Sequence, residues 1–254
     1  MGRIIAIANQ KGGVGKTTTC INLSACLAEV GKKTLVADID PQGNATSGFG
    51  IDKNKLDKTI YSLLIGESYL DAVKLETCVK NLYVIPANID LAGAEVELIG
   101  HERREFLLKR ILRNYNNLYD YIFIDCPPSL NLLTVNALAA ADAVIVPMQC
   151  EYYALEGLSQ LLKTIELIRT SVNKSLVIDG LVFTMFDARL NISLQVVDEV
   201  KRYISANIYK SMIPRNVRLS EAPSHGVPIT LYDSKSKGAE SYRILAREII
   251  DKEA

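Results

Sequence analysis

The most constraining stretch of the sequence, Lys-Gly-Gly-Val-Gly-Lys-Thr-Thr at residues 11–18, lies between an apolar run at residues 3–8 and an amphipathic pattern. Three glycines in four positions let the backbone turn tightly and direct its N–H groups toward one anion. A helix beginning near Gly15 adds the positive end of its dipole at the same point. A strand, a glycine-rich loop and a helix in this order predict a phosphate-binding loop at the edge of a sheet.

The side chains of this loop suit a nucleotide and its metal ion. Lys16 supplies a positive charge for the β- and γ-phosphates, and Thr17 supplies a hydroxyl for Mg²⁺. The strict pattern G-x-x-x-x-G-K-[ST] is not met, because Gln10 stands where its first glycine should be and Lys11 stands at the loop entrance. The loop residues expected to contact nucleotide are Lys11, Gly12, Gly13, Val14, Gly15, Lys16, Thr17 and Thr18.

Apolar, β-branched runs recur along the chain, and each is followed by a polar or glycine-bearing loop and then a helical pattern. The runs that predict strands are residues 3–8, 33–37, 121–124, 143–148 and 178–184. The patterns that predict helices are residues 15–31, 132–141, 155–172, 192–204 and 239–252. This alternation predicts an α/β fold with a mostly parallel twisted sheet and helices on both faces.

Acidic residues follow two of these predicted strands. Asp38 and Asp40 come after the second strand, and Asp125 ends the run at residues 121–124. In a parallel sheet, ligands bind beyond the carboxyl ends of the strands, so these loops should converge on the phosphate loop. Any one aspartate could instead cap a loop or helix. Three at one edge favour a site in which Asp125 holds Mg²⁺ or its water ligands, with the other two near the γ-phosphate.

The overall charge balance excludes a global field that attracts nucleic acid. Lys plus Arg number 29 and Asp plus Glu also number 29, so the formal net charge is zero. The stretch of residues 189–247 is nevertheless basic, with ten Lys or Arg against five Asp or Glu. Five cysteines without a C-x-x-C pair indicate reduced thiols in a cytoplasmic protein. No linker or repeat divides residues 1–254, which predicts a single domain.

The whole pattern resembles the ParA/MinD family of ATPases, which carry a deviant Walker A motif with an additional lysine at the position of Lys11. Beyond the loop, the string D-x-D-P-Q-G-N from Asp38 resembles the second signature of the family. The likeness to chromosomal ParA proteins of the Soj type extends over nearly the whole chain. It includes the strings at residues 8–11, 149–157 and 213–226, the second of which contains Tyr152 and Tyr153.

The resemblance implies a Mg²⁺-dependent ATPase that binds ATP or ADP and forms a nucleotide-sandwich homodimer. The dimer should bind double-stranded DNA non-specifically and release it after slow hydrolysis stimulated by a ParB/Spo0J-type partner, which makes the protein cytoplasmic and nucleoid-associated. By resemblance, Lys11 reaches the partner's nucleotide, Asp40 orients the hydrolytic water and Asp38 supports the Mg²⁺ shell. Further residues are assigned in the same way, to adenine (Met185, Pro214, Arg215 and Asn216), to DNA (Arg189 and Arg218) and as possible DNA helpers (Lys201, Arg202, Lys235, Lys237, Arg243 and Arg247).

Two other functions share this type of site. A MinD-like ATPase would position itself at a membrane or on a non-chromosomal cargo, but residues 249–254, Ile-Ile-Asp-Lys-Glu-Ala, do not suit anionic lipid, so no stable membrane association is expected. A reductase of the nitrogenase iron protein type would need a cysteine pair to ligate its metal cluster. Cys126 and Cys150 lack the sequence surroundings that such a pair has in that family. Because the first strand starts at residue 3, no helix-turn-helix extension is expected before the loop.

Overall fold

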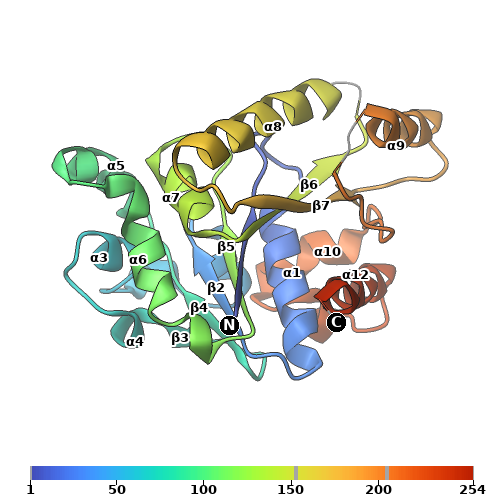
Figure 1. The fold of residues 1–254 in the computed structure, drawn as a ribbon. Coiled ribbons are helices and arrows are strands. Elements are labelled where there is room, and N and C mark those ends of the chain that lie inside the picture. Colours follow the sequence, from blue (N-terminus) through green and yellow to red (C-terminus); the bar gives the residue numbers. More distant parts are fainter. Residues whose placement is uncertain (1, 152–153, 204–205, 254) are drawn as a thin grey trace.

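The computed structural model describes residues 2–151, 154–203 and 206–253. Seven strands form one sheet in the order β3-β4-β2-β5-β1-β6-β7, and every neighbouring pair is parallel except β3 with β4 (Figure 1). The predicted mostly parallel sheet is therefore confirmed. The strands are β1 (Arg3–Ile7), β2 (Thr34–Asp38), β3 (Leu75–Glu76), β4 (Leu82–Ile85), β5 (Tyr121–Asp125), β6 (Ala143–Gln149) and β7 (Val177–Thr184).

Helices cover both faces of this sheet. The longer helices are α1 (Lys16–Glu29), α5 (Leu91–Glu97), α6 (Leu107–Arg113), α7 (Leu132–Ala140), α8 (Ala154–Ser171), α9 (Asn191–Tyr203) and α12 (Lys237–Glu253). The shorter ones are α2 (Asn44–Gly48), α3 (Ile60–Leu64), α4 (Leu70–Val73), α10 (Val217–Glu221) and α11 (Ile229–Tyr232). In the part of the chain that the structure describes, no helix is long and apolar enough to cross a membrane.

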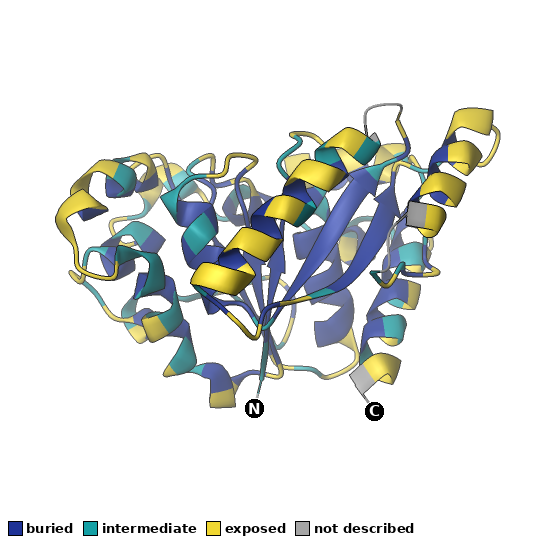
Figure 2. Ribbon diagram, turned by 45° about the horizontal axis from the view of Figure 1, so that its top comes forward, coloured by how far each residue is buried: buried dark blue, intermediate teal, exposed yellow. Residues whose placement is uncertain are grey.

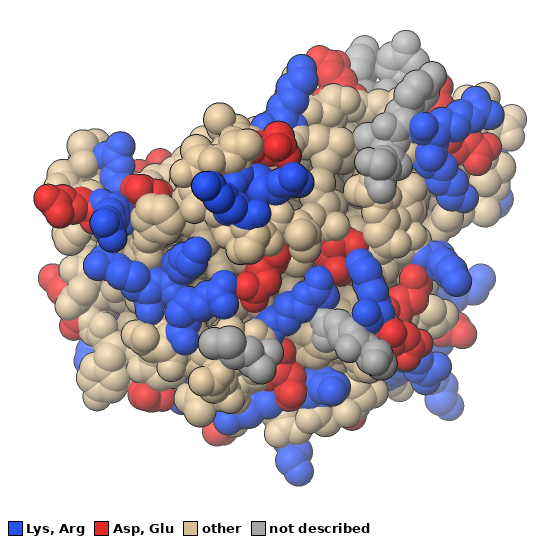
Figure 3. Space-filling view, in the orientation of Figure 1, with Lys and Arg blue, Asp and Glu red and all other residues tan. Residues whose placement is uncertain are grey.

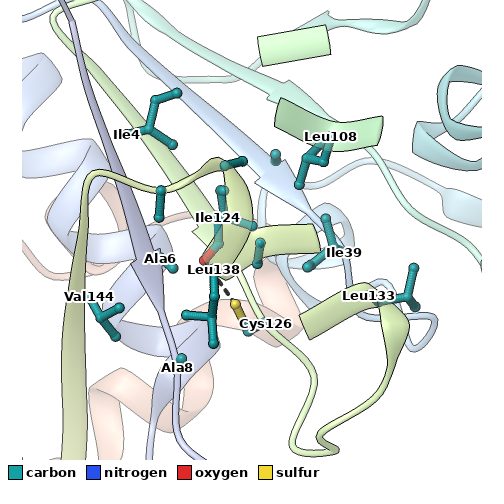
Figure 4. Packing of buried hydrophobic residues seen from close by; sticks show 14 of the residues in the cluster. Ile4, Ala6, Ala8, Ile39, Leu108, Ile124, Cys126, Leu133, Leu138 and Val144 are labelled. Carbon is teal, nitrogen blue, oxygen red and sulfur yellow. Dashed lines mark hydrogen bonds between the residues drawn. The ribbon is translucent and has the colours of Figure 1, made fainter. Parts of the chain in front are cut away.

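Alternate residues of β1 belong to two separate cores. Ile4 and Ala6 pack with Leu108, Leu133 and Leu138 from α6 and α7 on one face (Figure 4). Ile5 and Ile7 pack on the other face, where Leu23 and Leu27 of α1 and Tyr242 and Leu245 of α12 cover the sheet. Because helices cover both faces, the strands carry near-continuous apolar runs, and the sheet is buried beneath exposed helix surfaces in Figure 2.

The last described helix is attached to the first. In Figure 1, α12 lies beside α1, and the buried hydroxyls of Thr19 and Tyr242 lie 3.1 Å apart between them. Arg243 donates from Nε to Glu29 at 3.0 Å and from Nη1 to the Ser234 carbonyl at 2.6 Å. This attachment holds α12 beside the helix that follows the phosphate loop, on the same face of the sheet.

A second attachment joins the far end of α12 to the sheet. β7 has one additional residue against β6, since Val144 pairs with Ile178 whereas Ile145 pairs with Gly180, which leaves Asp179 in a bulge. The buried Asp179 carboxylate accepts hydrogen bonds from Arg3 at 2.6 Å, from Lys252 at 2.8 Å and from the Tyr209 hydroxyl. Burial alone raises the pKa of Asp179, but these three donors outweigh it and lower the pKa below the ordinary value.

All five predicted strands are present, and the predicted helices are present with ends that differ by at most two residues. β3, β4 and the helices between residues 44 and 118 were not predicted. Residue 204, the predicted end of the fourth helix, and Tyr152 and Tyr153 lie outside the described residues.

Candidate nucleotide site

The glycine-rich loop, residues 8–15, connects β1 to α1 at the carboxyl edge of the sheet. Gly13 and Gly15 have φ angles of 74° and 84°, which a side chain would strain, and α1 begins directly at Lys16. Asn9 fixes the start of the loop, because its side-chain amide donates to the Pro147 carbonyl at 2.7 Å and its oxygen accepts from the Lys11 N–H at 3.0 Å. The loop thus has the conformation that the sequence predicts.

Two neighbouring strands support the loop from the side. Gln149, at the end of β6, donates from Nε2 to the Gly13 carbonyl at 2.9 Å. Thr184, at the end of β7, has its hydroxyl 2.8 Å from the Val14 carbonyl. These contacts turn loop carbonyls toward the protein and leave the N–H groups for a ligand. Sequence reasoning missed both residues, although Thr184 ends a predicted strand and Gln149 directly follows one, at the same carboxyl edge that selected Asp125.

Lys16 is buried at the base of the loop. Its side chain is folded back so that Nζ donates to the Lys11 carbonyl at 3.0 Å. Burial lowers the pKa of Lys16, while the charges of Asp125, Cys126 and Asp40 act in the opposite direction. The predicted phosphate lysine and the predicted acidic residues therefore lie close enough to interact.

Asp38 and Asp125 are direct neighbours in the β2–β5 register, and both are completely buried. Neither carboxyl oxygen of Asp125 makes a hydrogen bond of normal geometry with the described residues. Burial, and then the charge of Asp38, raise the pKa of Asp125 well above its ordinary value, and Thr17 and Lys16 oppose this shift. A buried carboxyl group beside the phosphate loop, with the Thr17 hydroxyl nearby but no hydrogen bond of normal geometry, has room for the ligands of a cation.

Asp38 differs because the protein supplies its partners. Its Oδ2 accepts from the N–H of Thr46 at 2.8 Å and from the hydroxyl of Thr46 at 2.7 Å, and its Oδ1 accepts from the Asp40 N–H at 3.2 Å. Burial raises the pKa of Asp38 to about 6, and these hydrogen bonds limit the rise. Asp40 is also buried, and its Oδ1 accepts from the Gln42 N–H at 2.9 Å.

The donor set fits Mg²⁺ with a phosphate ligand. Among the described residues, no group of three or more His, Cys, Asp or Glu side chains could hold a metal ion. Mg²⁺ needs no such cage, because it is usually bound through one or two carboxylates together with substrate phosphates and water. Asp125 and the Thr17 hydroxyl are the groups that suit it here.

A pocket of about 510 Å³ opens beside the loop. The four residues assigned to adenine by resemblance line it together with Gly15 and Thr18, namely Met185, Pro214, Arg215 and Asn216. Phe186 and Pro214 form a parallel bridge, and Met185 has a φ of 50°, an uncommon conformation for a side chain of this size. The side-chain oxygen of Asn216 caps α10 by accepting from the Arg218 N–H at 2.8 Å, so the side-chain NH₂ group and the backbone of Asn216 remain for a base.

Lys11 extends away from the loop and forms an ion pair with Glu151, and both side chains are partly exposed. At Gly12, an added Cβ would have no heavy atom of the described chain within 4 Å beyond its immediate neighbours. Nothing in the described chain therefore requires glycine at this position.

The basic residues predicted to contact DNA are at the surface and are paired within the chain. Arg189, whose side chain is 89% exposed, donates to Asp187 at 2.6 Å, and Arg218 donates to Glu221 at 2.9 Å. Figure 3 shows basic side chains mixed with acidic ones over α9 and down the side of α10 and α12. Arg243, a predicted helper, instead joins α12 to α1 through Glu29.

The chain matches known proteins along its length. Residues 2–178 match a family model described as an AAA domain. The sporulation initiation inhibitor protein Soj of Bacillus subtilis is 59% identical over 98% of both chains. The chromosome partitioning protein ParA of Myxococcus xanthus is 55% identical over 100% of this chain and 89% of its own. A Mycobacterium smegmatis structure, named cobyrinic acid a,c-diamide synthase with bound ADP and magnesium, has a TM-score of 0.88 at 39% identity, covering 98% of this chain and 94% of its own.

These matches confirm the fold class and the ATPase class predicted from the sequence. The chain is also 52% identical, over 98% of both chains, to a Treponema pallidum protein named chromosome-partitioning ATPase Soj. Full-length likeness to Soj and ParA proteins, together with the phosphate loop and the acidic residues at the carboxyl edge of the sheet, shows that the chain belongs to the Soj/ParA family of chromosome-partitioning ATPases.

Proposed function

We propose that this chain is a partitioning ATPase in which bound ATP creates a DNA-binding homodimer and hydrolysis reverses it. The observation that carries the proposal is the convergence of the glycine-rich loop, Lys16 and the unpartnered Asp125 carboxyl group at one edge of the sheet. The cofactors are ATP or ADP with Mg²⁺. ADP and magnesium are bound in the M. smegmatis structure of the same fold.

Each residue of the site has a distinct task in this proposal. Loop N–H groups and the Lys16 ammonium bind the phosphates, and the pocket lined by Met185 and Pro214 takes the base. When bound through Thr17 and Asp125, Mg²⁺ neutralises phosphate charge. Asp40 orients the water that attacks, with Asp38 beside it. Lys11 has to leave Glu151 in order to reach the nucleotide of a second copy.

DNA binding is assigned to the basic surface that includes Arg189 and Arg218. Both side chains are at least half exposed, and both are held by carboxylates with which a phosphate would compete. A ParB/Spo0J-type partner then accelerates hydrolysis by completing or rearranging the site, as trans-acting groups do in other phosphoryl-transfer switches. The protein accordingly acts in the cytoplasm on the nucleoid.

A nucleoid role is favoured over the MinD-like alternative by the packing of α12. An interfacial helix must offer its apolar face to lipid. The apolar side chains Tyr242, Leu245 and Ile249 of α12 are instead buried against the protein. Stable membrane association through this helix would require it to leave α1.

The test of the proposed cycle combines light scattering with ATP hydrolysis. Wild type should be monomeric with ADP and dimeric with a non-hydrolysable ATP analogue. Lys16→Ala should lose tight ATP binding, because it removes the buried charge of the loop. Asp40→Ala should bind ATP and dimerise but stop turnover. An Asp40→Ala protein that hydrolyses ATP at the wild-type rate would remove Asp40 from the mechanism.

The DNA surface is tested separately by salt titration of binding to two unrelated duplexes. The double variant Arg189→Ala, Arg218→Ala should weaken binding equally for both sequences. It should also flatten the dependence of log affinity on log salt by about 0.9 for each phosphate that the variant no longer neutralises. Arg169→Ala is the matched control, since Arg169 is similarly exposed and paired one helical turn away with Glu166. Unchanged affinity in the double variant would put the DNA surface elsewhere.

A further inference from the structure

The buried hydroxyl of Thr46 connects Asp38, in the nucleotide site, to the loop that follows β4. Thr46 is fully buried in α2, and its Oγ1 donates to the Asp38 carboxylate at 2.7 Å. The same oxygen accepts a hydrogen bond from the Ala87 N–H at 2.9 Å. Ala87 is also fully buried, in the loop that follows β4.

The two loops are also in direct backbone contact at this point. A Cβ added to Gly43 would lie 2.6 Å from the Ala87 carbonyl oxygen, and Gly43 has a φ of 58°. Between these contacts runs the segment that carries Asp40, whose carbonyl accepts from the Gly43 N–H at 2.8 Å. The two ends of the segment from Asp38 to Thr46 are therefore joined to each other by hydrogen bonds, and the segment contacts Ala87 at Gly43 and at Thr46.

We propose that Thr46 is a positioning residue for ATP hydrolysis, which holds Asp38 as a hydrogen-bonded carboxylate and thereby fixes the segment that presents Asp40. This inference rests on the proposed hydrolysis at Asp40. Three donors, the N–H groups of Asp40 and Thr46 and the hydroxyl of Thr46, converge on the Asp38 carboxylate. A carboxylate bound by three donors fixes the loop that carries it. Asp125 is then the carboxyl group whose oxygens remain available to a metal ion.

The hydroxyl, and not only the volume of the side chain, is what the geometry requires. Removing it takes one donor from Asp38 and leaves the buried Ala87 N–H without its acceptor. Outer groups that orient carboxylates in a site typically change metal affinity or activity by about 10–100-fold when they are removed. Because Thr46 lies behind Asp38, its removal should affect turnover more than the binding of ATP.

The experiment measures kcat, KM for ATP and the Mg²⁺ concentration at half-maximal turnover in wild type, Thr46→Val and Thr46→Ser. Thr46→Val keeps the shape without the hydroxyl, and kcat should fall about 10–100-fold, with KM for ATP changed by less than about threefold. Thr46→Ser keeps the hydroxyl and should restore most of the turnover. If Thr46→Val is too unstable to purify, Thr46→Ala removes the same group and takes its place.

The matched control is Thr34→Val. Thr34 is equally buried, begins the strand that Asp38 ends, and donates its hydroxyl to the Lys32 carbonyl at 3.3 Å. Its turnover should stay near that of wild type. Equal loss of kcat in Thr46→Ser and Thr46→Val, or wild-type kcat in Thr46→Val, overturns the inference. Absence of ATP hydrolysis in wild type would instead overturn the proposed function itself.

Discussion

At the scale of single residues, two buried aspartates stand side by side with different surroundings. Asp38 receives three hydrogen bonds, whereas the Asp125 oxygens have none of normal geometry within the described chain. An ionised carboxylate without partners in the interior costs the fold several kcal/mol, to order of magnitude. The Asp125 carboxylate therefore lowers the stability of the ligand-free fold, while its oxygens remain available to a ligand.

Replacing Asp125 by Asn should stabilise the ligand-free protein, because the substitution removes the buried charge while retaining the shape. We expect a gain of about 1–2 kcal/mol near neutral pH, limited by the unpaired amide that replaces the charge. For a chain of this size, this corresponds to a rise in melting temperature of about 2–8 °C. Calorimetry without nucleotide measures the gain, and with Mg²⁺ and ATP the wild type should recover or exceed it.

The pH dependence of that gain has a definite sign. An aspartate in the unfolded chain has a pKa of about 3.9. In the folded protein, the pKa of Asp125 lies well above its ordinary value. The folded state thus binds the proton more tightly, and wild type loses stability as the pH rises between these two pKa values. The advantage of Asp125→Asn should be absent near pH 4 and grow above it. An advantage that is constant with pH would show that charge is not its cause.

Much of the site could be predicted from single residues, because the loop glycines, Lys16 and the aspartates belong to one short pattern each. The roles of Thr46, Gln149 and Thr184 could not be predicted from a short sequence pattern. Their roles depend on contacts with Ala87, Gly13 and Val14, which lie in loops far away in the sequence. A serine, threonine or glutamine side chain alone does not indicate which partner it will meet.

At the scale of elements, β3 and β4 escaped prediction for physical reasons. β3 has two residues, too few for any alternation, and β4 is a run of four that begins directly after Asn81, at φ 66°. β4 takes its place in the sheet by pairing with β2, where Thr34 aligns with Leu82, and β3 in turn pairs with β4. The longer runs at β1, β6 and β7 are identified by their own apolar residues, and these were predicted correctly.

The attachment of α12 should depend on Asp179. Asp179→Ala removes the acceptor shared by Lys252 and the Tyr209 hydroxyl, and we expect a loss of about 3 kcal/mol in the free energy of unfolding. The pKa of Asp179 is lowered in the folded protein. Its contribution to the free energy of unfolding is therefore present above about pH 4 and is lost as the pH falls below that value. Urea unfolding measures the loss, and hydrogen exchange should locate it in the last turns of α12.

The control for this element is Asp71→Ala. Asp71 forms an ion pair with Lys74 at 2.5 Å at the surface, where such pairs contribute about 0–1 kcal/mol. An equal loss of stability in both variants would mean that burial of the ion pair is not what matters. Unchanged hydrogen exchange in α12 of Asp179→Ala would place the effect outside this helix.

At the scale of the whole molecule, Gly12→Val should separate folding from assembly. Gly12 does not have a positive φ, and an added Cβ has open space around it within the described chain. The variant should therefore keep the stability of wild type within about 0.5 kcal/mol. In the proposed dimer two phosphate loops approach each other, so the branched side chain should block the dimer formed with a non-hydrolysable ATP analogue.

Light scattering and thermal unfolding of the same sample give both readings for Gly12→Val. Gly100→Val is its control, since Gly100 also has free space and no positive φ but lies in the segment after α5. It should dimerise like wild type. A nucleotide-dependent dimer of normal size in Gly12→Val would argue against a sandwich in which the loops meet.

The position of the phosphate loop in the sheet also has a consequence for synthesis of the chain. β1 pairs with β5 and β6, so its strand partners lie between residues 121 and 149, and α12, which packs beside α1, ends only at Glu253. Ribosomes add about 5–20 residues per second, which leaves a nascent chain without its nucleotide-binding element complete for roughly 10–50 s. In the first part of that interval, until β5 has been made, the apolar β1 has no strand neighbour. Chaperones that shield extended apolar segments then have a substrate in the region that later holds ATP.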